Sequence, residues 1–205
     1  MKRSIDQPIP GLRERKKART RAEIQGHALR LFRQQGYEST TVHQIIEEAE
    51  VSESTFFRYF PTKADVVLFD GMDALIVEAF RKQPHEFSEI HALRVALRTV
   101  FGGLSVQEGS DQRERVVLIF SVRELRATLL DQLVSTMELL GQVLAERTGR
   151  QPDDIALRTV AGAVVGVAMA VMVALADDPT ADIGLLLDQA LAHLEAGLNP
   201  ADPAR

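Results

Sequence analysis

Apolar residues recur along this chain at the spacing of amphipathic helices. Between residues 17 and 35, Ile24, Ala28, Leu31 and Phe32 form one apolar stripe, and Gly36 follows where the helix should end. The same pattern, with Gly, Pro or paired Asp at the breaks, predicts further helices over residues 42–49, 53–60, 63–82, 86–104, 111–130, 131–148, 153–176 and 182–197. No segment alternates with period two between hairpin turns. The chain is therefore predicted to be all-α, with about nine helices.

Two of the short helices are spaced as a helix-turn-helix. Residues 40–63 read TTVHQIIEEAEVSESTFFRYFPTK, with the small Ala49 late in the first helix and the apolar Val51 in the turn, as two steeply crossing helices require. In the second helix, Phe56 and Phe60 are expected to face inward. The outward or N-terminal positions, whose hydroxyls and guanidinium suit phosphates and base edges, are Glu53, Ser54, Thr55, Phe57 and Arg58. A helix pair that only packs a core is the alternative.

Charge is divided unevenly along the chain. The first 63 residues carry 12 Lys and Arg against 8 Asp and Glu, whereas the remaining residues carry 12 against 21. A basic end on an otherwise acidic chain indicates contact with a polyanion, although a solvated basic tail would look the same. The pattern predicts a flexible basic arm over residues 1–16, a helix-turn-helix domain over 17–63, a larger helical domain over 64–199 and a disordered tail over 200–205.

The run GYESTTVHQIIEEAEVSESTFFRYFPTKADVV resembles the DNA-binding domain of the TetR (tetracycline repressor) family, and the resemblance covers about residues 20–67. It implies that residues 53–60 are the recognition helix, with Glu53, Ser54 and Phe57 facing base edges. The implied phosphate contacts are Thr41, Thr55, Tyr59 and Lys63. The basic residues that precede this segment, which include Lys16, Lys17 and Arg19, are expected to lie along the minor groove or the phosphate backbone.

Two residues depart from the family pattern. Glu50 occupies a turn position that is commonly Gly, so its backbone must tolerate an unusual angle or the turn must relax. Phe57 replaces a common Tyr, so a phosphate-contacting hydroxyl is absent and the contact becomes apolar, as with a thymine methyl group. Both changes bear on which base sequence is read.

The segment from residue 159 to 176, TVAGAVVGVAMAVMVALA, is uncharged. Its 18 residues are just long enough to span a bilayer as a helix, so a membrane-spanning segment is the alternative interpretation. It is rich in Ala and Gly, however, and lacks an aromatic belt or a basic cluster that would orient insertion, so no membrane partner is expected. The resemblance implies instead that the last two helices form a homodimer interface. The predicted interface residues are Gly162, Ala163, Gly166, Ala170, Leu187 and Leu191.

The intervening helices are expected to enclose an effector cavity, as the resemblance implies. The candidate lining residues are the aromatic and apolar Phe80, Phe87, Phe101, Phe120 and Met137, together with the polar His91 and Arg123. Arg123 lies in VRELRATLLDQL, a segment with a faint resemblance to mycofactocin-regulator-like domains that sense acyl-coenzyme A thioesters. An arginine there could meet an anionic ligand or pair with a neighbouring carboxylate.

Catalytic and metal motifs do not occur. There is no HExxH, G-x-S-x-G, P-loop or Rossmann fingerprint, no cysteine, and no pair of histidines at i,i+4 spacing, so no enzyme, cofactor or metal is expected. With no signal peptide, a cytoplasmic location is expected. The function implied is a ligand-responsive repressor that binds an inverted-repeat operator in double-stranded DNA as a homodimer and is released by a small, largely apolar effector. A constitutive architectural DNA-binding protein is the alternative, but the large acidic helical body would then be superfluous.

Overall fold

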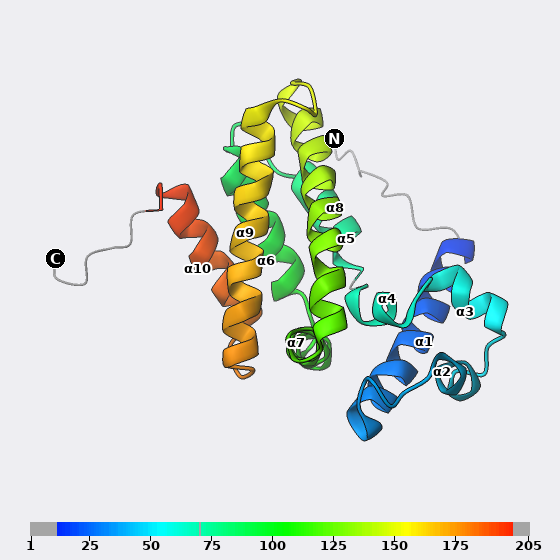
Figure 1. Cartoon of the computed structure of the whole chain (residues 1–205). Coiled ribbons are helices and arrows are strands. Elements are labelled where there is room, and N and C mark those ends of the chain that lie inside the picture. The colour runs from blue at the N-terminus through cyan, green and yellow to red at the C-terminus, as the bar shows by residue number, and fades with distance from the viewer. Residues whose placement is uncertain (1–11, 70, 199–205) are drawn as a thin grey trace. The chain divides into compact units, whose positions relative to one another are not determined.

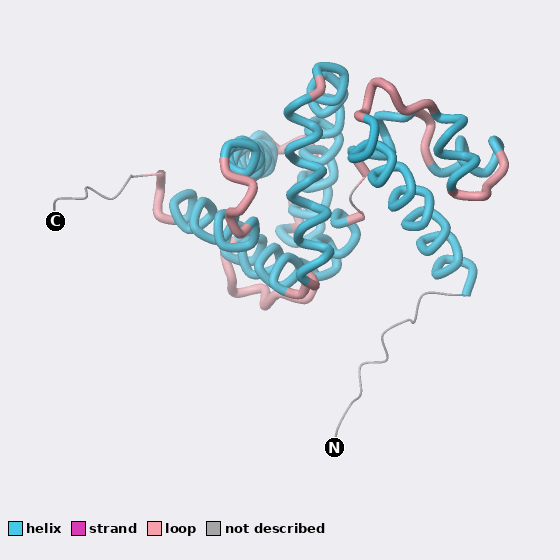
Figure 2. The backbone as a smooth tube through the Cα atoms, turned by 90° about the horizontal axis from the view of Figure 1, so that it is seen from below, coloured by secondary structure: helices cyan, strands magenta, loops and turns pink. Residues whose placement is uncertain are grey.

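The structure is a computed structural model, and it describes residues 12–69 and 71–198. All regular structure in these two ranges is helical, as predicted (Figure 1; Figure 2). The helices are α1 (Leu12–Gln35), α2 (Val42–Glu48), α3 (Glu53–Tyr59), α4 (Lys63–Leu68), α5 (Met72–Arg81), α6 (Glu89–Gly102), α7 (Val106–Ser121), α8 (Arg123–Thr148), α9 (Ile155–Asp177) and α10 (Ile183–Glu195).

The chain divides into two compact units, Met1–Val67 and Leu68–Arg205. The division falls at the last residue of α4, a few residues after the boundary at residue 63 that the sequence indicated. The first eleven residues of the predicted arm and the predicted tail over 200–205 lie outside the described residues.

In the first unit, α1 and the short helices α2 and α3 close around a small apolar core. Ile24 and Ala28 of α1, Ile45 of α2, and Phe56 and Phe60 at α3 are all fully or almost fully buried. Burying a large apolar side chain stabilises a fold by about 1.5–3 kcal/mol, so these residues hold the helix pair against α1. The inward orientation predicted for Phe56 and Phe60 is confirmed.

In the second unit, the long helices α8 and α9 lie side by side (Figure 1), and α5, α6, α7 and α10 pack around them. One apolar cluster includes Phe80, Leu93, Leu144 and Leu157, which come from α5, α6, α8 and α9. A second, smaller cluster lies among α7, α9 and α10 and consists of Val116, Val171, Leu175 and Leu187.

The predicted helix over 63–82 is wrong as one element, because it divides into α4 and α5. Gly71 precedes α5 with a φ of 70°, a left-handed conformation that Gly adopts without the steric cost of a side chain. The Asp-Gly pair at 70–71 is a turn signal that outweighs the helical spacing of the apolar residues on either side.

The predicted limits of three other helices also need correction. α7 begins at Val106, where a break was expected, because Ser105 and Glu108 form a capping box. α8 continues through residues 130 and 131, and the break lies instead at Val122, whose backbone is extended. α1 begins at Leu12, so the described end of the predicted arm is helical.

α9 contains the uncharged segment, and it is the one helix among those described that is long and apolar enough to cross a membrane. Its buried residues recur at helical spacing and face the same chain: Leu157, Ala161, Val164, Val171 and Leu175. Gly166 and Ala170 lie on another side of the helix and are exposed. One face of α9 thus packs within its own unit, and the other is left apolar at the surface.

Candidate nucleic-acid interface and ligand cavity

The start of α2 is fixed by a reciprocal hydrogen-bond pair. The Gln44 backbone N–H donates to Thr41 Oγ1 (3.2 Å), and the Thr41 N–H donates to Gln44 Oε1 (2.9 Å). Such a capping box satisfies two amides that the helix cannot pair itself. Thr41, predicted to contact a phosphate, is exposed at this helix end.

Three hydroxyls lie together at the start of α3. Ser52 Oγ accepts from the Thr55 backbone N–H (3.2 Å) and lies 3.1 Å from Ser54 Oγ and 2.8 Å from Thr55 Oγ1. Ser54 and Glu53 are exposed, and Thr55 is half-buried. The predicted base-facing end of the helix is therefore polar, accessible and held in shape by its own N-cap.

The outer side of α3 carries an aromatic and a cationic group. Phe57 is 45% exposed, and its ring meets the buried Phe56 edge to face at 5.4 Å between centroids. The Arg58 guanidinium lies 5.2 Å from the ring centroid of Tyr59, and Arg21 of α1 lies 5.7 Å from the same ring. These contacts limit how far the exposed side chains can turn.

The ammonium of Lys63, predicted to contact a phosphate, is held by contacts within its own chain. Its ammonium donates to the carbonyl oxygens of Tyr37 (2.9 Å) and Thr40 (3.0 Å) and lies 4.1 Å from the Tyr37 ring centroid. An ammonium has three N–H donors, so these contacts use two of them. Lys63 therefore anchors the loop between α1 and α2, a role that the sequence did not indicate.

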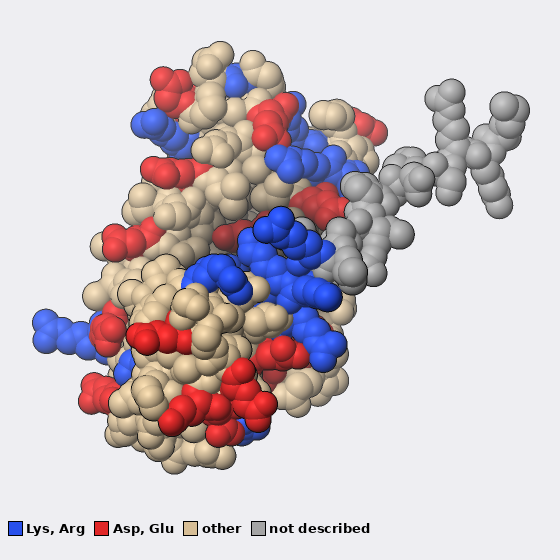
Figure 3. All heavy atoms as spheres, turned by 90° about the vertical axis from the view of Figure 1, so that its right-hand side faces the viewer, with Lys and Arg blue, Asp and Glu red and all other residues tan. Residues whose placement is uncertain are grey.

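Basic side chains are exposed along α1. Lys16, Lys17 and Arg19 all lie at the surface, and Arg19 also pairs with Glu23 at 2.8 Å. Lys and Arg side chains form a connected group on the face drawn in Figure 3, with acidic side chains on either side of it. Such a group provides the electrostatic attraction that binding to a phosphate backbone requires.

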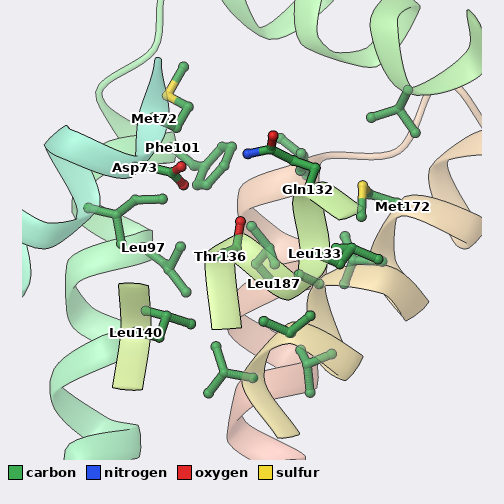
Figure 4. A pocket seen from close by; sticks show the side chains of 18 of the residues that line it. Met72, Asp73, Leu97, Phe101, Gln132, Leu133, Thr136, Leu140, Met172 and Leu187 are labelled. Carbon is green, nitrogen blue, oxygen red and sulfur yellow. The ribbon is translucent and has the colours of Figure 1, made fainter. Parts of the chain in front are cut away.

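The second unit contains a cavity of about 190 Å³. It is lined mainly by aliphatic side chains of α5 to α10, and Leu68 at the end of α4 also contributes. The polar lining residues are Asp73, Gln112, Arg115, Gln132 and Thr136. Figure 4 shows the Gln132 amide pointing toward Phe101, and the Asp73 carboxylate lies next to Phe101. These residues form the polar end of the cavity, and Leu140 and Leu187 lie away from it.

Two of the polar lining residues are buried together on α7. Arg115 is 7% exposed and Gln112 is 8% exposed. Arg115 Nη1 donates to Gln112 Oε1 (2.9 Å), and its Nη2 donates to the carbonyl oxygen of Leu68 (3.4 Å). The guanidinium thus joins the wall of the cavity to the end of α4.

Of the seven residues predicted to bind a ligand, only Phe101 lines this cavity. Phe80 is in the core, and Arg147 lies over its ring. Phe87 packs edge to face on His91, which also pairs with Glu195 at 2.9 Å. The other three lie elsewhere in the second unit: Phe120 beside the smaller cluster, Met137 against the larger one, and Arg123 exposed at the start of α8.

The predictions for the other six residues are wrong for this cavity because aromatic content says nothing about the direction in which a side chain points. The sequence of α7 does contain a pattern that indicates the cavity lining. Gln112, Arg115, Val116 and Ile119 are spaced as one helical face, so two polar residues share the side of two apolar ones. Polar residues inside an apolar stripe indicate a buried polar group more directly than a count of aromatic rings.

Of the residues predicted for the dimer interface, some are exposed and others are buried within their own chain. Gly166 and Ala170 are exposed, and Gly162 and Ala163 are partly exposed. Leu187 and Leu191 are buried within their own chain and line the cavity, so that part of the prediction is wrong. The outward apolar residue of α10 is Leu185 instead, which is 55% exposed.

A helix-turn-helix with a polar outer face, joined to a helical unit that contains a largely apolar cavity, is the arrangement of a helix-turn-helix transcription regulator with a second, helical domain. Residues 26–68 match the family of bacterial regulatory proteins named tetR, and residues 88–199 match the MftR C-terminal domain. The chain belongs to the TetR family of transcriptional regulators. This membership confirms the resemblance found in the sequence and places the chain among DNA-binding regulators, which are not enzymes.

Individual relatives agree with this membership. The chain is 36% identical over 152 residues to the transcriptional regulator TcmR of Streptomyces glaucescens, over 71% of this chain and 67% of TcmR. It is 25% identical over 188 residues to the mycofactocin biosynthesis regulator MftR of Mycobacterium tuberculosis, over 90% of this chain and 94% of MftR. The crystal structure of Thermus thermophilus FadR in complex with lauroyl-CoA has the same fold, with a TM-score of 0.55 and 24% identity, and the similarity covers 90% of this chain and 98% of FadR.

Proposed function

We propose that this chain is a ligand-responsive transcriptional repressor that binds an inverted-repeat operator as a homodimer and is released by a small effector. The observation that supports this most strongly is the combination, in one chain, of an exposed polar recognition helix and a largely apolar cavity in the second unit. A protein that only bound DNA would have no need of such a cavity, because an empty apolar space reduces stability.

The proposed DNA contacts follow from the accessible side of the first unit. Ser54, Glu53 and Phe57 reach base edges from α3 in the major groove, where such contacts give sequence preference. Contacts to phosphates position the protein and carry no sequence information. The residues proposed for them are Thr41, Thr55, Arg58, Tyr59 and Lys63, with Lys16, Lys17 and Arg19 of α1.

The proposed dimer uses the outward faces of α9 and α10. Gly166, Ala170 and Val173 of α9 and Leu185 of α10 are exposed, apolar or small, and uncharged. A soluble chain buries a large apolar surface of this kind against a partner. A two-fold axis through these helices would present two recognition helices to an inverted repeat.

The proposed effector occupies the cavity of the second unit. FadR of Thermus thermophilus has been solved with lauroyl-CoA, and the similar structure of SmeT with triclosan, so proteins of this fold hold ligands that carry large apolar groups. An effector can release DNA only if it binds the low-affinity conformation more tightly than the DNA-binding one. Release therefore requires that occupation of the cavity alters the end of α4, which Arg115 contacts.

The test begins by sequencing the genomic DNA that the purified chain retains, which identifies the operator. Ser54→Ala should then relax the preference at one base position of each half-site, by about 1 kcal/mol or less, because one hydroxyl contact is lost. Lys17→Ala should weaken binding to all sequences alike and reduce the salt slope by about 1 per site. Retention of random sequences only, or a base preference that depends on Lys17 and not on Ser54, would contradict the proposed interface.

A further inference from the structure

We propose that the effector cavity selects a small, uncharged molecule of about eight to ten non-hydrogen atoms with one polar group, of the type of a monocyclic phenol. This inference rests on the proposed function, since it names the ligand class of the same cavity. It differs from the anionic acyl thioester that Arg123 indicated, because Arg123 is exposed and outside the lining.

The size follows from the volume of the cavity. An apolar cavity of about 150 Å³ holds one benzene molecule, so the 190 Å³ here leaves space for one substituted ring or a short chain. A twelve-carbon acyl chain is too large for this volume. The ligand is thus limited to a single ring with a short substituent, or an aliphatic molecule of similar size.

The shape of the wall favours a compact apolar body. Most of the lining is aliphatic and comes from α5 to α10; it includes Leu93 and Leu97 of α6, Leu140 of α8, Val164 of α9, and Leu187 and Leu191 of α10. Such a wall provides burial without a directional contact, so it accepts an apolar group in any orientation. Orientation must come from the polar end.

The polar end offers neutral groups that can bind one hydroxyl or carbonyl. Gln132 and Thr136 are four residues apart on α8 and line the same cavity. Among the described residues, neither side chain has a hydrogen-bond partner from the protein. An amide and a hydroxyl can each donate and accept, so the pair matches a ligand hydroxyl, which also does both.

The charged groups of the lining oppose an ionic ligand. Arg115 and Asp73 both line the cavity, and their charges have opposite signs, so their combined charge is zero. Arg115 already donates to Gln112 and to the Leu68 carbonyl. A carboxylate ligand would therefore lose its hydration for little net attraction, which excludes it in favour of a neutral molecule.

The experiment measures binding of three probes to the full chain by calorimetry and thermal shift: 4-ethylphenol, propylbenzene and 4-methylbenzoate. We expect 4-ethylphenol to bind roughly tenfold more tightly than 4-methylbenzoate, because only the anion loses a charged hydration shell. It should also bind about threefold more tightly than propylbenzene, which has no hydrogen bond to offer.

Two variants and a control connect these affinities to the polar end. Thr136→Val keeps the side-chain shape and should remove the preference for 4-ethylphenol over propylbenzene. Thr128→Val is the matched control on α8, because Thr128 lies outside the lining and donates to the Glu124 carbonyl. Ala168→Leu fills part of the cavity and should abolish binding of both neutral probes.

Two results would overturn the inference. One is tight binding of 4-methylbenzoate that is lost in Arg115→Met, since this would establish an anion site. The other is binding of lauroyl-CoA, with release of operator DNA, by a chain that 4-ethylphenol does not bind. In that second case the proposed function would still hold, whereas a chain whose operator affinity no ligand changes would contradict the proposed function itself.

Discussion

At the turn between α2 and α3, the backbone of Glu50 adopts a φ of 51°. The sequence indicated this strain, because Glu50 stands where the family commonly has Gly. A left-handed conformation costs a residue with a Cβ about 1 kcal/mol, and Gly avoids that cost. Glu50→Gly should therefore raise the free energy of unfolding by about 1 kcal/mol or less in urea denaturation at neutral pH. Glu50→Val should lower it, and a Gly variant less stable than the wild type would contradict this explanation.

Lys63 contributes to stability as well as to DNA binding. Because its ammonium satisfies the carbonyls of Tyr37 and Thr40, Lys63→Ala should lower the free energy of unfolding by about 1–2 kcal/mol. Thermal denaturation without DNA measures this directly. Lys17→Ala is the control, since Lys17 is exposed on α1 and should leave the stability unchanged. Equal stability of the two variants would mean that Lys63 does not stabilise the fold and acts only in DNA binding.

Between elements, an ion-pair network joins α6 to α10. The Arg94 guanidinium binds Asp188 through Nε (2.7 Å) and Nη2 (3.1 Å), and its Nη1 binds Glu195 (3.2 Å). The hydrogen bond from Arg94 holds the pKa of Asp188 below its usual value. The carboxylate therefore stabilises the fold above the pKa of an unfolded Asp, and this contribution is lost as the pH falls through the lower folded pKa.

We expect Asp188→Asn to cost about 1 kcal/mol at neutral pH, because the carboxylate is only partly shielded from water. The difference from the wild type should begin to shrink below about pH 4, where Asp188 of the unfolded chain becomes protonated, and should disappear once the pH has fallen through the lower pKa of the folded state. Urea denaturation at several pH values tests both statements. Glu78→Gln is the control, since Glu78 and Lys82 form an exposed pair within α5 and its C-cap. A difference that stays constant with pH would exclude the Asp188 carboxylate as its cause.

The outward face of α9 gives a prediction for assembly. A Cβ atom added at Gly166 meets no other part of its own chain within 4 Å, and Gly166 is exposed, so Gly166→Leu should fold normally. In the proposed dimer, the added group would overpack the seam and lower the dimer affinity by about tenfold. Sedimentation measures this, with Gly166→Ala as a control of smaller volume. A wild-type chain that is monomeric at micromolar concentration would contradict the dimer.

The elements could be predicted where local signals agree with the apolar spacing. α2 and α3 follow Thr41 and Ser52, two hydroxyl residues that cap helices well, and their limits were predicted closely. The break at Val122 could not be found, because neither Gly nor Pro marks it and its extended backbone depends on packing. At α7 two local signals conflict, because Gly109 favours a break whereas Ser105 and Glu108 form a capping box, and the helix begins at the capping box.

For the molecule as a whole, the sequence indicated both units but not the lining of the cavity. The faces of α3 could be assigned because Phe56 and Phe60 are buried at a spacing that one short helix dictates. The cavity depends on six helices meeting, and no local pattern reports how they meet. Leu187 and Leu191 show the difficulty, since an amphipathic helix has an apolar side whether it faces its own chain or a partner.

The position of Leu68, at the end of α4 and in the lining of the cavity, has a thermodynamic consequence. Leu68 is the last residue of α4 and lines the cavity, and its carbonyl oxygen accepts a hydrogen bond from Arg115, so a molecule in the cavity lies against the residue that ends α4. The protein can be free, bound to the effector, bound to the operator, or bound to both. The factor by which the effector lowers the affinity for the operator must therefore equal the factor by which the operator lowers the affinity for the effector. Calorimetry with 4-ethylphenol, with and without operator DNA, should give two equal factors, and Arg115→Met should bring both closer to one.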